Sequence, residues 1–241
     1  MHNCIQGMRF NFFCMRPFIF TLFILLSFYG CSRENGHAGN DEGMLEYEIK
    51  YPEDLQGQSV TAFLPSEMTT YIKGNNTLLK IKGGFGLYSL KYISKAAGDS
   101  CFTLFKLFDK KMYYPMNSHK TLFVFRELGK PNIKLIKDSI KIIAGFNCNK
   151  AVISFQNPKL KPIEVYYTKE IGVKKPNINT PFEDIPGTMM EFNFFYKSLS
   201  FNLKAVKFTP VEIDDSEFNV PPDYKLATEG EIEGFIETLL Q

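Results

Sequence analysis

The feature that most constrains the fold is an alternation of apolar and polar residues that recurs along most of the chain. In Met44–Tyr51, four apolar residues alternate with three charged ones. This period of two is typical of a strand that buries one face and leaves the other in water. The C-terminal residues instead repeat with a helical period, so the sequence predicts mostly strands followed by a helix.

Eleven further segments have strand character, and turn signals such as Gly74–Asn76 and Gly145 separate several of them. They are Met68–Lys73, Thr77–Lys82, Leu87–Ile93, Cys101–Phe108, Lys111–Tyr114, Thr121–Arg126, Ile140–Ile143, Cys148–Phe155, Ile163–Thr168, Met189–Tyr196 and Phe201–Phe208. Residues 53–67 fit either a short helix or a loop. Strands this closely spaced predict an α+β fold that is mostly β: a strongly curved antiparallel sheet, or half-open barrel, with a few helices.

The C-terminal segment has the pattern of an amphipathic helix. Thr228 and Glu231 have the spacing of a capping box, in which two side chains satisfy free backbone N–H groups of the first turn. Apolar residues then follow at helical spacing, at Ile232, Phe235, Ile236 and Leu239. Gly230 and Gly234 each weaken a helix by about 1 kcal/mol relative to Ala, so packing on the sheet has to stabilise it.

Three of the strand-like segments are apolar on both faces and therefore need a cover on both sides. One cover is expected to be a helix, and the other is either the opposite wall of the half-barrel or a bound apolar ligand. A filled aromatic core and a ligand-lined cavity both fit this pattern. The residues expected to line such a cavity are Phe102, Leu104, Phe123, Phe125, Phe192 and Phe194.

The first thirty residues have the composition of a secretory signal peptide. They contain Arg9 and Arg16 but no acidic residue, and an apolar run covers residues 18–29. That run is shorter than the roughly 20 apolar residues of a membrane-spanning helix. It ends at Gly30 and Cys31, which resemble a bacterial lipobox whose Cys receives a lipid anchor. An ordinary signal peptide or an uncleaved anchor would also fit these residues.

The sequence thus predicts three parts: a signal peptide at 1–30, a lipidated Cys31 with a flexible tether at 31–43, and one β-rich domain at 44–241. The tether is polar and rich in glycine. Ser32 after Cys31 is compatible with delivery to the outer membrane, on its periplasmic or surface face. We expect the domain to sit beside the membrane, which the protein contacts through the N-terminal lipid.

Composition excludes one class of partner and offers no catalytic motif. A formal net charge of +2 provides no basic field for nucleic acid. No phosphate-binding loop, dinucleotide fingerprint, HExxH or GxSxG motif occurs, and no Cys/His spacing suggests a metal. We therefore expect no enzyme activity, no cofactor and no metal. The least favoured alternative is a hydrolase that uses His119 as its base.

Two cysteines fall within the predicted domain, Cys101 and Cys148. Disulfides persist in an envelope compartment, so these two residues either pair or remain as separate buried thiols. The distance between their Cα atoms decides between the two, and sequence does not supply it.

Five segments in order resemble the GLPGLI-type envelope proteins, a group with no settled activity. They are Leu64–Thr69, Lys141–Ala151, Tyr166–Ile171, Ile185–Phe192 and Phe218–Tyr224. The resemblance implies a fold like that of the lipoprotein carriers (LolA-like), a curved antiparallel sheet with helices under its concave side. Members of that wider group carry acyl chains, so the resemblance implies function by analogy alone.

Two functions follow as expectations. The first is an envelope lipoprotein whose half-barrel binds a lipid or another apolar molecule. The second is a structural or interaction lipoprotein with a filled core that docks another envelope protein. The two differ in one observable property, which is whether the space enclosed by the sheet is occupied by the chain's own side chains.

Overall fold

The computed structural model describes residues 40–55, 59–95, 100–117, 120–197 and 199–239. The chain divides into two compact units, residues 1–36 and 37–241. The predicted signal peptide, Cys31, His119 and most of the predicted tether lie outside the described residues. The second unit holds all of the described sheet and core, so we expect residues 32–241 to fold without the leader.

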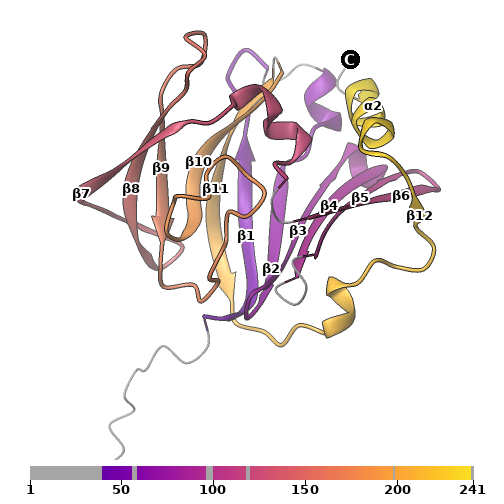
Figure 1. The fold of residues 1–241 in the computed structure, drawn as a ribbon, viewed down its shortest axis with the longest axis horizontal. Coiled ribbons are helices and arrows are strands. Elements are labelled where there is room, and N and C mark those ends of the chain that lie inside the picture. The colour runs from indigo at the N-terminus through magenta and orange to yellow at the C-terminus, as the bar shows by residue number, and fades with distance from the viewer. Residues whose placement is uncertain (1–39, 56–58, 96–99, 118–119, 198, 240–241) are drawn as a thin grey trace, which may run out of the picture. The chain divides into compact units, whose positions relative to one another are not determined.

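The second unit is built on one strongly curved sheet of twelve strands (Figure 1). All neighbouring strands are antiparallel except β12 and β6, and the order is β12-β6-β5-β4-β3-β2-β1-β11-β10-β9-β8-β7. The strands are β1 (Glu42–Lys50), β2 (Glu67–Lys73), β3 (Asn76–Gly83), β4 (Tyr88–Lys95), β5 (Ser100–Leu107), β6 (Lys110–Asn117), β7 (Asn132–Ile143), β8 (Phe146–Ser154), β9 (Ile163–Thr168), β10 (Thr188–Tyr196), β11 (Leu199–Thr209) and β12 (Lys225–Leu226). The predicted fold class is confirmed.

Four short 3-10 helices and one α-helix complete the described part of the chain. They are η1 (Ser59–Phe63), η2 (Gly84–Gly86), η3 (Phe123–Leu128), η4 (Asp215–Phe218) and α2 (Glu229–Leu239). The predicted C-terminal helix is confirmed together with its capping box, since the backbone N–H of Thr228 donates to Glu231 and that of Glu231 donates to the Thr228 hydroxyl. No helix in the described residues is long and apolar enough to cross a membrane.

The strand predicted at Thr121–Arg126 is wrong, because Phe123–Leu128 form η3. A run that is apolar at every position fits a buried helical turn as well as a strand, so its periodicity cannot separate the two. The tertiary structure decides: the backbone N–H of Leu122 donates to the carbonyl of Asn179 rather than to a neighbouring strand.

The sheet buries side chains on both faces. We call the face under η3, α2 and residues 171–187 the inner face, and the opposite one, which carries η4, the outer face (Figure 1). Leu104 and Phe105 are adjacent in β5 and both are 1% exposed, yet they pack into different clusters. The expectation that strands apolar on both faces need two covers is therefore met, and both covers are segments of this chain.

Candidate functional site

The structure divides the six residues predicted to line a cavity between the two faces of the sheet. Leu104 lies on the outer face, where it packs with Ile213 and Phe218 of the η4 segment. Phe102 is partly buried against the same cluster. Their register in β5 places both side chains on one face, but this face is covered by residues that follow β11 and not by a ligand.

The other four predicted lining residues lie on the inner face. Phe123 of η3 is buried in the cluster around Ile232 of α2. Phe125 is buried two residues further on, and Phe192 and Phe194 of β10 are partly buried against its cluster. The structure therefore brings four of the six residues together and sets Phe102 and Leu104 apart.

Phe125 packs between aromatic rings on the inner face. Its ring meets Phe182 edge to face at 5.6 Å between centroids, and it meets Phe194 in the same way at 5.3 Å. Phe194 also stacks on Phe201 of β11, at 5.0 Å. These distances are those of close-packed aromatic pairs. Phe125 and Phe194 thus pack against other side chains of this chain at the place where the sequence fits either a filled core or a bound ligand.

A buried polar cluster at Asn179 joins the inner cover to the sheet. Its Oδ1 accepts hydrogen bonds from the Tyr92 hydroxyl at 2.6 Å and from the Cys101 thiol at 3.0 Å. Its Nδ2 donates to the carbonyls of Asn117 and Lys120. Asn179 is 1% exposed and has a φ of 63°, a conformation that Asn tolerates better than most residues. Sequence reasoning missed this cluster, because nothing local distinguishes Asn179 from its turn-rich surroundings.

Cys101 and Cys148 are both free and buried, so the open alternative resolves to two separate thiols. Cys101 belongs to the Asn179 cluster, whereas Cys148 packs with Tyr47 and Met190. Burial raises the pKa of the Cys148 thiol to about 11. A nucleophilic cysteine needs a thiolate near neutral pH, so Cys148 has the properties of a packing residue.

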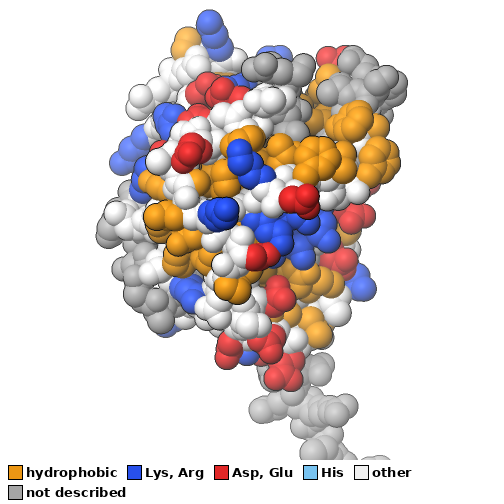
Figure 2. All heavy atoms as spheres, turned by 90° about the vertical axis from the view of Figure 1, so that its right-hand side faces the viewer, with side chains coloured by type: hydrophobic (Ala, Val, Ile, Leu, Met, Phe, Trp, Pro, Cys, Tyr) orange, Lys and Arg blue, Asp and Glu red, His pale blue; other side chains and the backbone are white. Residues whose placement is uncertain are grey.

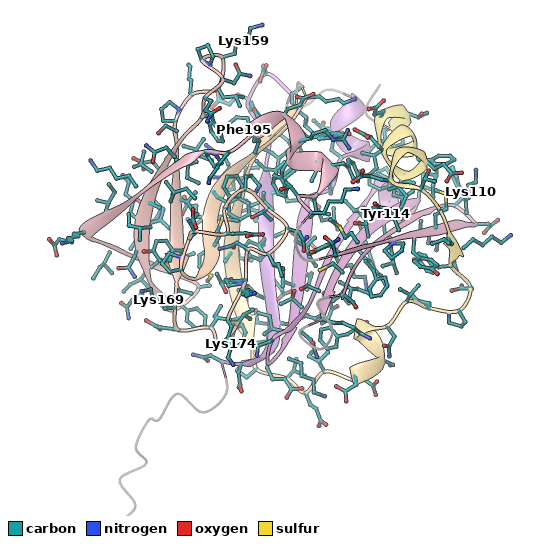
Figure 3. All side chains as sticks on the ribbon, in the orientation of Figure 1. Lys110, Tyr114, Lys159, Lys169, Lys174 and Phe195 are labelled. Carbon is teal, nitrogen blue, oxygen red and sulfur yellow. The ribbon has the colours of Figure 1, made fainter. Side chains whose placement is uncertain are left out.

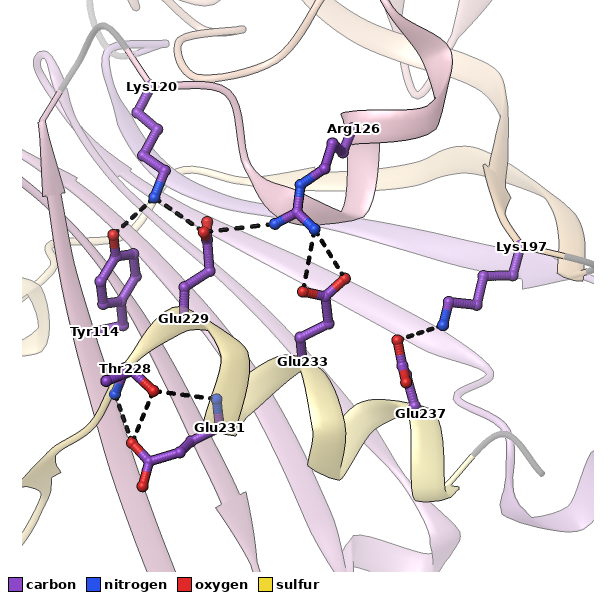
Figure 4. Close-up of polar contacts among 9 residues, drawn as sticks. All are labelled: Tyr114, Lys120, Arg126, Lys197, Thr228, Glu229, Glu231, Glu233 and Glu237. Carbon is purple, nitrogen blue, oxygen red and sulfur yellow. Dashed lines mark hydrogen bonds and ion pairs between the residues drawn. The ribbon is translucent and has the colours of Figure 1, made fainter.

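An ionic cluster fixes α2 over the inner face. Three basic side chains from other segments meet three glutamates of the helix (Figure 4): Lys120, Arg126 and Lys197 meet Glu229, Glu233 and Glu237. Lys120 also donates to the Tyr114 hydroxyl at 2.8 Å. The glutamates are spaced four residues apart and therefore share one side of the helix. Since the Arg126 side chain remains 59% exposed, we expect these ion pairs to orient α2 more than to stabilise the fold.

An open pocket of about 550 Å³ lies where α2 begins. It is lined by Tyr114, Pro115 and residues 226–231. The backbone N–H groups of Thr228 and Glu231 are already engaged by the capping box, and the Glu229 carboxylate by Lys120. Both carboxylates that line the pocket, Glu229 and Glu231, therefore already have partners within the chain.

The described residues contain no group of three or more His, Cys, Asp or Glu placed to hold a metal ion. Within them, the strongest pKa shifts belong to buried tyrosines and have desolvation as their first cause. The Tyr92 hydroxyl is an example, and its raised pKa keeps it a hydrogen-bond donor to Asn179. The expectation of a non-enzymatic protein stays a prediction.

Comparison with known proteins adds little to this geometry. No family model matches the sequence, and no curated protein matches it. Among solved structures, the chain is similar to one titled "Crystal structure of MucB", with a TM-score of 0.32 and 7% sequence identity. The alignment covers 78% of this chain and 60% of the MucB chain. The resemblance to the GLPGLI-type proteins therefore rests on its five motifs.

Proposed function

We propose that this chain is a lipid-anchored protein of the bacterial cell envelope that acts through its surface, by docking another envelope component. The location and the anchor follow from the basic, acid-free start and from the apolar run that ends at Gly30 and Cys31. Ser32 is compatible with the outer membrane. Anchoring would confine the folded unit to the membrane surface and raise its local concentration near a docking partner.

The packing of the inner face carries this proposal. Phe125 is 8% exposed and lies between Phe182 and Phe194. An interior carrier needs an apolar cavity of several hundred Å³ for its cargo. Here the corresponding space is filled by η3 and by residues 171–187, so the outside of the molecule is the part left to make contacts.

Native mass spectrometry tests the proposal against the apolar-ligand alternative. Residues 32–241 would be purified from the envelope compartment without detergent and measured natively, and then again after organic extraction. The expected result is the same apo mass in both measurements. A stoichiometric lipid mass that extraction removes would overturn the proposal and make the protein a lipid carrier.

A matched pair of variants sharpens the measurement. Phe125→Ala removes a buried ring from the inner face, whereas Val211→Ala removes methyl groups from a residue that is 45% exposed. A filled interior predicts that only Phe125→Ala gains binding of a small apolar probe, because only this change opens a void. Strong probe binding by the unmodified protein would contradict the proposal.

A further inference from the structure

Two neighbouring turns each expose a phenylalanine on a left-handed backbone. Phe85 in the β3–β4 turn is 86% exposed with a φ of 55°, and Phe108 in the β5–β6 turn is 60% exposed with a φ of 51°. A positive φ is unusual for a bulky residue and costs about 1 kcal/mol or more. Both positions therefore combine backbone strain with loss of hydrophobic burial, which packing does not explain.

The two turns form one continuous apolar rim. The backbone N–H of Phe108 donates to the carbonyl of Leu87 at 2.9 Å, which ties the turns together. Phe63 of η1 meets Phe85 edge to face at 6.4 Å. Phe63 and Leu87 are themselves exposed. Four of the large exposed hydrophobic side chains thus lie at one end of strands β3–β6.

A group of lysines adjoins this rim on the outer face. In the register of the sheet, Lys80 lies directly opposite Lys91, and Lys106 lies directly opposite Lys111. Like charges placed opposite each other across two strands destabilise a sheet. Lys82 belongs to the same row, because its register runs through Ser89 of β4 to Lys106. The five lysines therefore share one face.

Two carboxylates act on this group at longer range, Glu217 on Lys80 and Asp223 on Lys106, without forming an ion pair with either lysine. Lys111 pairs with Asp223, and among the described residues the ammonium groups of the other four lysines form no ion pair within 4.0 Å. Glu67 lies across from Lys82 in the neighbouring strand but makes no such pair. Figure 2 shows a face on which basic side chains, with acidic ones among them, lie beside exposed hydrophobic ones. Lys110, labelled in Figure 3 at the β5–β6 turn, is not part of this group, because its ammonium group lies over the Phe235 ring of α2 on the inner face.

We propose that this surface, made of Lys80, Lys82, Lys91, Lys106 and Lys111 with Phe63, Phe85, Leu87 and Phe108, docks on an anionic lipid bilayer. The lysines would contact negatively charged headgroups while the phenylalanines enter the boundary between headgroups and acyl chains. This assignment rests on the proposed function only in placing the activity on the outside of the molecule.

The composition of the surface favours lipid over a protein partner. Interfaces between proteins are enriched in Tyr, Trp and Arg and depleted in Lys, whereas this surface has five lysines and no arginine. Its apolar groups stand on protruding turns instead of lining a groove. Basic residues on one side and Phe or Leu at the edge are the combination found in segments that lie in a membrane interface.

Vesicle co-sedimentation of residues 32–241 tests the proposal. We expect binding to vesicles of equal phosphatidylglycerol and phosphatidylcholine, weak binding to phosphatidylcholine alone, and a loss of binding as salt rises from about 0.1 M to about 1 M. Lys80→Gln, Lys91→Gln and Lys106→Gln combined should lower the partition coefficient by roughly a hundredfold. The charge-matched control, Lys134→Gln, Lys137→Gln and Lys161→Gln, should leave it nearly unchanged.

A second variant separates membrane contact from folding. Phe85→Asn with Phe108→Asn places a residue that tolerates a positive φ at both turns, so it should fold at least as stably as the parent. Vesicle binding should nevertheless fall by roughly tenfold or more.

Three results would overturn the proposal. They are equal binding to the two vesicle types, equal effects of the two lysine triples, and saturable capture of an acidic protein without vesicle binding. A lipid mass in the native spectrum would contradict the proposed function, which needs a filled interior, but it would leave the bilayer-docking proposal standing. The two proposals can therefore fail separately.

Discussion

The Tyr92 hydroxyl donates a hydrogen bond of 2.6 Å to Oδ1 of Asn179, although the two residues are 87 positions apart. Tyr92 lies in a central strand and Asn179 in the inner cover, so this bond connects two layers of the molecule. The side-chain amide nitrogen of Asn179 also donates two hydrogen bonds, to the carbonyls of Asn117 and Lys120. We conclude that Asn179 fixes the position of the inner cover.

Asn179→Ala should be among the most destabilising polar substitutions in the chain. It removes the acceptor of the Tyr92 hydroxyl and the amide donor to two part-buried carbonyls, and each such loss costs about 1–3 kcal/mol. We expect the free energy of unfolding in urea to fall by about 3 kcal/mol or more. Asn132→Ala, on the exposed start of β7, is the control and should change it by less than about 0.5 kcal/mol. Similar values for both variants would refute this role.

Phe125→Ala should destabilise the protein strongly. Truncation of a buried Phe removes transfer free energy and leaves a cavity, which together cost about 3–5 kcal/mol. Chemical denaturation of Phe125→Ala and of the exposed Val211→Ala measures the difference. A loss below about 1 kcal/mol would mean that the inner face is looser than the aromatic distances indicate.

Helix α2 should depend on its buried face more than on its ion pairs. Ile232 is 0% exposed, and Ile→Ala at a buried site costs about 2–5 kcal/mol. Glu233→Gln removes a partner of Arg126, which is largely exposed, so its effect should stay below about 1 kcal/mol and vanish at high salt. Thermal unfolding of both variants at two salt concentrations checks this. A larger loss of stability for Glu233→Gln than for Ile232→Ala would contradict this prediction.

The capping box should make α2 sensitive to acid. Hydrogen bonds from the backbone and hydroxyl of Thr228 lower the pKa of Glu231 below its usual value near 4.5. Because the folded pKa is depressed, this bond stabilises the protein above about pH 4.5 and is lost as pH falls through the folded pKa. Unfolding curves between about pH 6 and about pH 3 should therefore depend less on pH in Glu231→Gln. An unchanged pH dependence would argue against the bond.

Both thiols of residues 32–241 should be inaccessible in the folded protein. Cys101 and Cys148 are free and buried, and burial raises the pKa of Cys148 to about 11. Mass spectrometry after iodoacetamide treatment should show no added groups under native conditions and two in denaturant. Two cysteines that stay unmodified in denaturant until a reductant is added, with a mass lower by two hydrogens, would instead indicate a disulfide.

The sequence by itself determined the elements that depend on neighbours along the chain. Period-two alternation predicted β1, because a strand's side chains alternate between faces whatever strand lies beside it. The turn signal at Gly74–Asn76 likewise predicted the break between β2 and β3. The capping box predicted the start of α2 for the same reason, since Thr228 and Glu231 satisfy each other within one turn.

Only the tertiary structure decided what meets across the sheet. The run around Phe123 became η3, Cys101 and Cys148 stayed apart, and Leu104 was buried away from Phe125. These outcomes depend on strand order, curvature and the path of the inner cover, which bring together residues far apart in sequence. Local periodicity states which side chains share a strand face, but it does not state which distant segment covers that face.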